Sequence, residues 1–299
     1  MKPSALTLPL AHKSTNVRLL ATLPLRQLAL RAAGSVAPNA TAQLVSHWFR
    51  TPPAPRPVSP KAKALFDSAD DRFAVTVPTC FGVPETTRIS VSVWGRGPAV
   101  YLLHGWGGRA AQWVSFVEPL VQAGFTAITL DAPGHGESPA PRTSLMHFAA
   151  SLDAVVDSVG PARAVVGHSL GGAASAFAIR RGMASDGAVL IGAPAAPDQF
   201  FRDFMQRVGV PEQLLTRVRA DIEHRYGFGW SDLAVGAPDG APRALVVHDA
   251  DDAEVDPDDA RRIAGVWPGA DLLETRGLGH QRILRDRNVI REVVGWIAR

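Results

Sequence analysis

Short runs of uninterrupted apolar residues alternate with helical stretches from Phe73 onward, and this alternation constrains the fold more than any other feature. The apolar runs are residues 99–103, 126–130, 164–166, 188–191 and 244–247. A strand buried on both faces is typically such a run, whereas a half-buried strand alternates in polarity. Alternating strands and helices predict a mostly parallel sheet with right-handed crossovers. Such sheets bind ligands at the carboxyl ends of their strands, so functional residues are expected in the loops there.

Charge is distributed unevenly along the 299 residues. Residues 1–66 contain no Asp or Glu, and their nine basic residues are Lys2, Lys13, Arg18, Arg26, Arg31, Arg50, Arg56, Lys61 and Lys63. Subtracting these nine from the 31 Lys and Arg leaves 22 against 28 Asp and Glu, so the remainder carries a net charge of −6. Phosphate binding needs clustered Lys and Arg, so this acidic body is not expected to bind nucleic acid.

The basic N-terminal part is expected to be helical and to end in a stiff linker. Pro24 is placed to open a helix that Gly34 closes, and Asn39 can cap a second helix. The apolar residues expected to share one face of the second helix are Leu44, Val45, Trp48 and Phe49. Five prolines within residues 51–60 predict an extended segment. We therefore divide the chain into an extension with its linker, residues 1–72, and a catalytic body, residues 73–299.

The extension allows two interpretations. Cleavable organelle targeting segments are also Arg-rich and poor in acids, although Arg18, Pro24 and Arg26 interrupt the apolar stretch that a secretory signal needs. Alternatively, the helices pack on the body or on a neighbouring subunit, which leaves a homo-oligomer open. We expect the extension to be accessory, because every candidate catalytic residue follows the linker.

Composition limits the remaining classes of protein. Apolar residues make up 46% of the chain and charged residues 20%. No run of about 18 uncharged apolar residues could span a bilayer, so we expect a soluble, cytoplasmic protein without stable membrane insertion. Cys80 is the single cysteine; it can form neither an intramolecular disulfide nor a zinc cluster by itself, and we expect it to pack near a strand end. No metal or other cofactor is expected.

The strongest local indication of chemistry is a G-x-S-x-G pattern, Gly167-His168-Ser169-Leu170-Gly171, between an apolar strand and an Ala-rich helix. A strand that turns sharply into a helix needs small residues beside the turn, and the turn exposes the serine hydroxyl. The N–H of Leu170 at the helix start can hold an oxyanion. Ser169 is therefore the candidate nucleophile, and packing is the expected role of His168.

A second Gly-rich loop, His104-Gly105-Trp106-Gly107-Gly108, follows the predicted strand at 99–103. Holding a tetrahedral oxyanion requires a second backbone N–H, and a Gly-rich turn lets the backbone approach a substrate closely. Trp106 is the candidate for this donor. The alternative is a tight turn with no catalytic task.

Together with two further segments, these motifs resemble the α/β-hydrolase superfamily, in particular its lipase-like and esterase-like serine hydrolases. The further segments are the turn DAPGHGES at 131–138 and the late pair Gly279-His280, and all four follow the family's order between about residue 73 and the end. The resemblance implies the α/β-hydrolase fold: a mostly parallel central sheet flanked by helices, with a small helical lid. It gives the 131–138 turn a structural role only.

The resemblance also implies a general base and an acid that orients it. In the family's order the acid follows the serine and the base comes last, which indicates His280 in the Gly-rich loop 277–280. In family members the acid usually lies three residues after a glycine. Asp249 stands at the place of that glycine in this chain, so the same spacing selects Asp252. Asp249 and Asp251 depart from that pattern, and their charge would favour a protonated imidazole.

Residues 195–241 lie where this family carries its lid. Helical spacing relates Phe200, Phe201, Phe204, Met205 and Val208. A second helix is expected from Pro211 to Tyr226, ending at Gly227. An apolar lid face would line an acyl pocket, with Phe200, Phe204 and Trp106 as candidate substrate-binding residues. Alternatively, the phenylalanines only pin the lid to the body.

The expected function is the cleavage of carboxylic esters through an acyl-enzyme intermediate, with Ser169, His280 and Asp252 as the triad and a small ester or acyl compound as partner. Thioesters, lactones and perhydrolysis use the same triad and stay open. A protein of another class, a non-catalytic ligand receptor, could use the same fold, since fold does not dictate function.

Overall fold

The structure is a computed structural model that describes residues 16–55, 57–78, 87–238 and 240–299, with the backbone alone at residues 16–24 and 207. Cys80 and the first 15 residues lie outside the described residues. The expectations for the cysteine and for a targeting segment therefore stay predictions.

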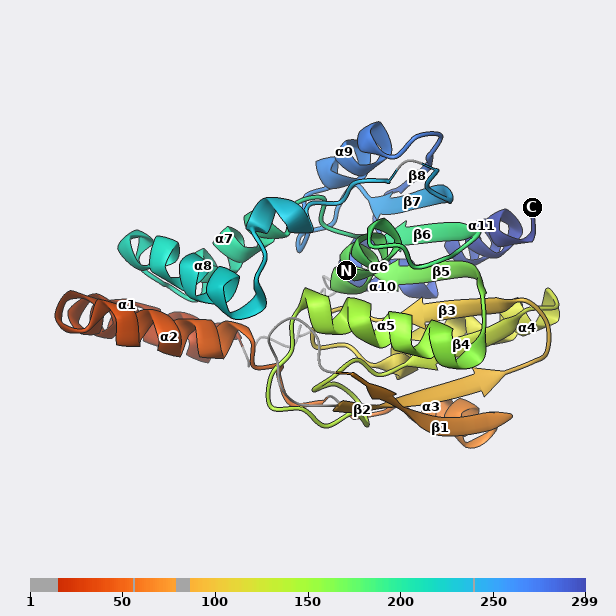
Figure 1. The fold of residues 1–299 in the computed structure, drawn as a ribbon, viewed down its shortest axis with the longest axis horizontal. Coiled ribbons are helices and arrows are strands. Elements are labelled where there is room, and N and C mark those ends of the chain that lie inside the picture. The colour runs from red at the N-terminus through yellow and green to blue at the C-terminus, as the bar shows by residue number, and fades with distance from the viewer. Residues whose placement is uncertain (1–15, 56, 79–86, 239) are drawn as a thin grey trace, which may run out of the picture.

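A single sheet of eight strands forms the centre of the described chain, in the spatial order β1-β2-β4-β3-β5-β6-β7-β8 (Figure 1). The strands are β1 (Asp71–Val77), β2 (Thr87–Trp94), β3 (Ala99–Leu103), β4 (Thr126–Leu130), β5 (Ala162–His168), β6 (Gly187–Ile191), β7 (Arg243–Asp249) and β8 (Asp271–Thr275). β2 pairs antiparallel with β1 and β4, and all other neighbours are parallel. The predicted mostly parallel sheet is confirmed.

Helices cover both faces of this sheet. One apolar core receives buried residues of α5 (Leu145–Val159), α6 (Leu170–Arg180) and α9 (Asp258–Val266). The other receives those of the 3₁₀ helix η1 (Ala110–Ser115), α4 (Val117–Gln122) and α11 (Arg287–Ala298). Inner strands contribute to both cores, because successive side chains of a strand point to opposite faces. This double burial explains the unbroken apolar runs.

Residues 110–122 form two short helices, η1 and α4, and not one continuous helix. Pro119 has no N–H to donate, which costs least in the first turn of a helix, where that N–H would have no intrahelical partner. α4 therefore begins at Val117, and the chain before it forms a separate 3₁₀ helix.

The N-terminal extension forms two helices whose bounds differ from those expected. α1 (Asn16–Val36) contains Pro24, so the expectation that Pro24 opens a helix is wrong. A proline inside a helix removes one backbone hydrogen bond, which weakens the helix without necessarily ending it. α2 (Pro38–Phe49) starts with Pro38 at its first position, and Asn39 instead accepts a 2.7 Å hydrogen bond from Arg217.

The expected shared face of α2 is also wrong. Val45 is buried and Phe49 is half-buried, whereas Leu44 and Trp48 are 46% and 45% exposed. Residues four positions apart share a helix face, so Val45 with Phe49 and Leu44 with Trp48 form two separate rows. α2 packs against α8 (Glu212–Tyr226).

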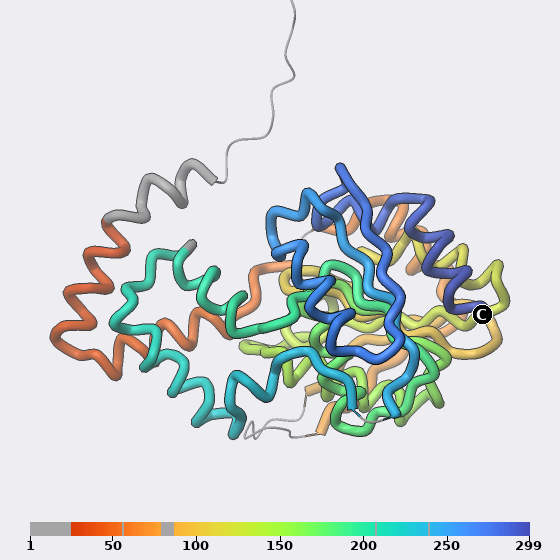
Figure 2. Tube along the Cα trace, turned by 90° about the horizontal axis from the view of Figure 1, so that it is seen from above, coloured from red at the N-terminus to blue at the C-terminus, as the bar shows by residue number. Residues whose placement is uncertain are grey.

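The predicted lid lies between β6 and β7 and consists of α7 (Pro197–Arg207), α8 and the 3₁₀ helix η2 (Trp230–Leu233). α8 ends at Gly227, whose φ of 68° is the left-handed conformation expected of a C-terminal glycine. α1 and α2 lie beside α7 and α8, and the four helices project together beyond the sheet (Figures 1 and 2).

The proline-rich linker returns from α2 toward the sheet and passes over two of its loops. A Cβ added to Gly107 would lie 2.9 Å from Pro53 Cγ, and one added to Gly134 would lie 2.6 Å from Pro52 Cγ. The linker ends in α3 (Pro60–Asp67), whose Leu65 carbonyl accepts a hydrogen bond from the Trp94 indole. Within the described ranges, no helix is long and apolar enough to cross a lipid bilayer.

Candidate active site

Ser169 occupies the sharp turn between β5 and α6. Its φ of 53° and ψ of −123° make it the one non-glycine residue with a positive φ among those that the structure describes. Such a conformation is strained for an L-residue and persists only where the surrounding structure enforces it. The Ser169 N–H donates a 2.9 Å hydrogen bond to the Ile191 carbonyl at the end of β6. The strand-turn-helix predicted from the G-x-S-x-G pattern is present.

The flanking glycines allow backbone segments to meet around this turn. A Cβ on Gly167 would lie 2.5 Å from the Gly171 carbonyl oxygen. A Cβ on Gly171 would lie 2.4 Å from the carbonyl oxygens of Leu103 and His104. These contacts bring the start of α6, where Leu170 lies, against the end of β3 and the loop that carries Trp106.

His280 and Asp252 come together from two different loops. His280 lies in the short helix α10 (Gly279–Arg282), which the 3₁₀ helix η3 (Ile283–Arg285) follows, and Asp252 lies after β7. His280 Nδ1 is 2.7 Å from Asp252 Oδ2, and both residues are buried. Asp252 Oδ1 accepts hydrogen bonds of 2.8 Å and 3.0 Å from the N–H groups of Glu254 and Val255. The carboxylate is therefore fixed and can orient the imidazole.

Asp252 stays ionised in spite of its burial. Burial would raise its pKa, but contacts with His248 and His280 and the N–H of Val255 hold the pKa below its usual range. His248 is buried, and its Nε2 lies 3.2 Å from the same Oδ2 atom, although not in hydrogen-bond geometry. Two imidazoles therefore approach one carboxylate oxygen.

Asp249, for which the sequence suggested only an electrostatic contribution, anchors the loop that carries His280. It is buried and accepts hydrogen bonds from Thr275 Oγ1, Leu278 N and Gly279 N at 2.8, 3.0 and 2.9 Å. Asp251 is exposed and accepts one from Gly277 N at 2.8 Å. Burial would raise the pKa of Asp249, but these hydrogen bonds lower it. Its position at the end of β7, three residues before Asp252, is the signal that could have indicated this role.

His168, expected only to pack, also positions the candidate base. Its Nε2 donates a 2.9 Å hydrogen bond to the carbonyl of His280, and the two rings lie 4.6 Å apart between centroids. Burial lowers the pKa of His168 to about 3, with a further contribution from His280. His168 is therefore neutral at ordinary pH and links the nucleophile turn to the loop of the base.

Ser169 and His280 line the same cavity without a hydrogen bond between their side chains. Among the described residues, no hydrogen bond joins Ser169 Oγ to His280 Nε2. Nε2 lies 4.0 Å from Glu254 Oε2 instead. Catalytic hydrogen bonds are often long in unliganded sites and tighten when substrate binds, so the separation is compatible with base catalysis.

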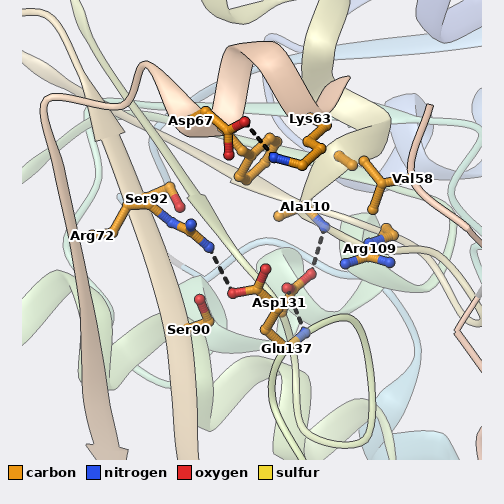
Figure 3. Close-up of a pocket in the computed structure, with 12 residues that line it drawn as sticks. Val58, Lys63, Asp67, Arg72, Ser90, Ser92, Arg109, Ala110, Asp131 and Glu137 are labelled. Atoms are coloured by element: carbon orange, nitrogen blue, oxygen red, sulfur yellow. Dashed lines mark hydrogen bonds and ion pairs between the residues drawn. The ribbon is translucent and has the colours of Figure 1, made fainter. Parts of the chain in front are cut away.

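The 131–138 turn holds the loop that contains Trp106. Asp131 Oδ1 accepts a 2.6 Å hydrogen bond from Ala110 N, and Asp131 Oδ2 accepts one of 2.8 Å from Glu137 N, as Figure 3 shows. His135 Nε2 accepts a 2.9 Å hydrogen bond from Gly107 N. His104 Nε2 accepts one of 3.0 Å from Ala132 N. The structural role expected for the turn thus includes fixing the backbone on both sides of Trp106.

These hydrogen bonds require neutral imidazoles, because a protonated ring nitrogen cannot accept. Burial lowers the pKa of both His104 and His135 to about 4. Both rings are therefore neutral at neutral pH.

Within the described ranges, no group of three or more His, Cys, Asp or Glu side chains is placed to hold a metal ion.

Two cavities that share Trp106 and Phe200 as walls lie at this site. The first, of about 390 Å³, has many polar walls and is lined by Ser59, Trp106, Arg109, Gln112, Ser169, Phe200, Glu254, His280, Gln281 and Arg285, among others. The second, of about 60 Å³, is almost entirely apolar, and its walls include Phe49, Trp106, Leu145, Met146, Leu170, Phe200, Phe204, Ile222 and Trp230. All three candidate substrate-binding residues line the apolar cavity. The N-terminal extension and its linker also contribute to the walls, with Phe49 in the apolar cavity and Ser59 in the polar one. The accessory role expected for the extension stays a prediction.

The chain matches a family model and has curated relatives. The model of the alpha/beta hydrolase fold matches residues 98–238. A non-heme haloperoxidase from Rhodococcus erythropolis is 33% identical over 157 residues, which are 51% of this chain and 57% of that protein. A 2-hydroxy-6-oxononadienedioate/2-hydroxy-6-oxononatrienedioate hydrolase from Escherichia coli (strain K12) is 38% identical over 105 residues, 32% and 36% of the two chains. The chain thus spans less than two thirds of the length of either relative.

Solved structures resemble the chain over a longer stretch. An esterase from Exiguobacterium antarcticum superposes with a TM-score of 0.59 and covers 76% of this chain and 100% of its own. Its sequence identity is 18%, so the likeness concerns the fold alone.

Proposed function

We propose that this chain, which belongs to the α/β-hydrolase superfamily, is a serine hydrolase that cleaves carboxylic esters through an acyl-enzyme intermediate. The observation that carries the proposal is one cavity lined by both Ser169, on its strained turn, and His280, held by Asp252. A serine that lines a cavity and an oriented imidazole are the two groups that nucleophilic acyl transfer needs.

In the proposed reaction, Ser169 Oγ attacks the ester carbonyl while its proton passes to His280 Nε2. The N–H groups of Leu170 and Trp106 hold the resulting oxyanion. The tetrahedral intermediate collapses, the bond to the alcohol oxygen breaks, and His280 gives its proton to the leaving alcohol. Water, deprotonated by His280, then attacks the acyl-enzyme. The bond to Ser169 Oγ breaks, His280 returns its proton to Oγ, and the acid is released.

Asp252 acts through His280 in this scheme. The ionised carboxylate accepts a hydrogen bond from Nδ1–H, which leaves Nε2 free to receive the proton of the serine. It also stabilises the positive charge that His280 acquires. The low pKa of Asp252 supports this role, because the carboxylate stays charged throughout.

Perhydrolysis is a second candidate, and the similarity to a non-heme haloperoxidase favours it. Hydrogen peroxide would take the place of water in the second step and attack the acyl-enzyme, giving a peroxy acid and free Ser169. Adding hydrogen peroxide to a steady-state ester assay and titrating the peroxy acid distinguishes the two reactions. If no peroxy acid forms, water is the only acceptor of the acyl group, and the esterase proposal is unchanged.

The experiment that tests the proposal combines a fluorophosphonate probe with p-nitrophenyl esters. Wild-type protein is expected to be labelled at Ser169 and to release p-nitrophenol, and Ser169→Ala is expected to lose both, with turnover lower by several orders of magnitude. A folded Ser169→Ala variant with near-normal turnover would contradict the proposal. A folded wild type that neither labels nor turns over would indicate a ligand receptor instead.

A further inference from the structure

Phe49, the last residue of α2, packs among aromatic side chains of the lid. Its ring centroid lies 5.3 Å from those of Phe201 and Phe204 and 6.5 Å from that of Trp230. The rings of Phe49 meet Phe201 and Phe204 edge to face, an arrangement that stabilises aromatic pairs beyond the burial of their area. Phe49 therefore belongs to the aromatic cluster of the lid, although about 150 residues of chain separate them.

Further contacts fix the position of Phe49. The carbonyl of Arg50, the next residue, accepts a 2.8 Å hydrogen bond from the N–H of Thr143. The Arg217 guanidinium of α8 donates a 2.7 Å hydrogen bond to Asn39 at the start of α2. α2 is thus attached to the lid and, through Thr143, to the segment before α5.

Phe49 and Thr143 both line the small apolar cavity, together with Trp106 and Leu170. Trp106 and Leu170 are the proposed donors to the oxyanion, so an ester carbonyl held by them lies beside this cavity. Ser169 and His280 line the larger, more polar cavity. The acyl chain of a bound ester therefore fits the apolar cavity, and a polar alcohol part fits the other.

The size of the apolar cavity limits the acyl chain. At about 60 Å³, the apolar cavity is much smaller than the polar cavity of about 390 Å³. A small apolar cavity favours short acyl groups such as butanoyl. The benzyl side chain of Phe49 forms part of the wall of the apolar cavity, and Phe49 belongs to the N-terminal extension.

We propose that the N-terminal extension is part of the substrate site, and that Phe49 restricts this enzyme to esters of short, apolar acyl groups. The inference rests on the proposed esterase function and adds its substrate class and the residue that sets it. Phe49 is a specificity-determining residue and takes no part in the chemical steps.

The test compares p-nitrophenyl butanoate with p-nitrophenyl octanoate for wild type, Phe49→Ala, Phe49→Leu and Trp48→Ala. Phe49→Ala is expected to raise the octanoate-to-butanoate ratio of kcat/KM by about tenfold or more, the order of effect of a few methylene contacts in an apolar pocket. Phe49→Leu keeps an apolar side chain of intermediate size and is expected to give a smaller rise, which serves if Phe49→Ala fails to fold. Trp48→Ala is the matched control, because Trp48 is the adjacent residue and faces away from this cavity, 45% exposed.

An equal loss of activity toward both esters in folded Phe49 variants would overturn the inference, because it would indicate a purely structural side chain. An unchanged ratio in both variants would also overturn it, as would an equal shift in Trp48→Ala. Fluorophosphonate labelling separates the two proposals. Wild type that labels at Ser169 but shows no effect of position 49 contradicts this inference alone, whereas wild type that neither labels nor turns over contradicts the esterase function as well.

Discussion

The backbone N–H of Gly279 donates a 2.9 Å hydrogen bond to Asp249, and the next residue in the chain is the candidate base His280. Asp249 Oδ1 also accepts a hydrogen bond from Asp251 N, in the turn that leads to Asp252. One buried carboxylate therefore holds the turn of the proposed acid and the loop of the proposed base. This places a structural aspartate three residues before the proposed catalytic one.

Asp249→Asn is expected to lower kcat by about 100-fold, because a shift of about 1 Å in a catalytic group can cost that much. The amide would direct an NH₂ group at backbone N–H donors that now meet carboxylate oxygens. The melting temperature should fall too. Asp251→Asn is the control, because Asp251 is exposed. Among the described residues, its side chain accepts one hydrogen bond, from Gly277 N. Equal kinetics for the two variants would contradict the anchoring role.

Asp252→Asn is expected to reduce kcat by roughly 10⁴, with the fold retained, because the amide favours the wrong imidazole tautomer. Asp251→Asn should reduce it far less, since that carboxylate faces Gly277 N rather than His280. Both values would be measured with one activated ester after circular dichroism has shown intact folds. A large loss in Asp251→Asn together with a small one in Asp252→Asn would move the acid by one residue.

The stability of the fold should decrease as the pH falls from about 6.5 to about 4, because the pKa of His135 is near 6.5 when unfolded and about 4 when folded. In that window the unfolded state binds more protons, so the free energy of unfolding falls with falling pH. His135 contributes on the order of 1 to 3 kcal/mol to this change. His135→Gln keeps an acceptor for Gly107 N and removes the titration, so its melting temperature should change less between pH 7 and pH 5. An unchanged pH dependence in His135→Gln would argue against this role.

Much of the body of the protein could be predicted from the sequence. β3 and β4 have the predicted bounds, because strands buried on both faces are continuous apolar runs between polar turns. The positions of Ser169, His280 and Asp252 were predicted from a local turn motif and from the order of motifs along the chain. The structure places His280 against Asp252 and both Ser169 and His280 on one cavity; their chemical roles stay proposals.

The contributions of other residues depend on contacts that are remote in sequence. His168 reaches the carbonyl of His280, which is 112 positions away, and no periodicity indicates such a hydrogen bond. Phe49 belongs to a helix for which the sequence could not specify a packing partner. The row of Val45 and Phe49 and the row of Leu44 and Trp48 are equally apolar, so only the packing of α2 against α8 decides which one is buried.

The most direct test of the central claim is to trap the acyl-enzyme. The reaction of wild-type protein with p-nitrophenyl butanoate would be quenched in acid during turnover. The protein would then be digested, and the peptide masses would be measured by mass spectrometry. The account predicts one butanoyl group on the peptide that contains Ser169, and none in Ser169→Ala. Rapid turnover with butanoyl on another residue, or with no acylated peptide at all, would contradict it.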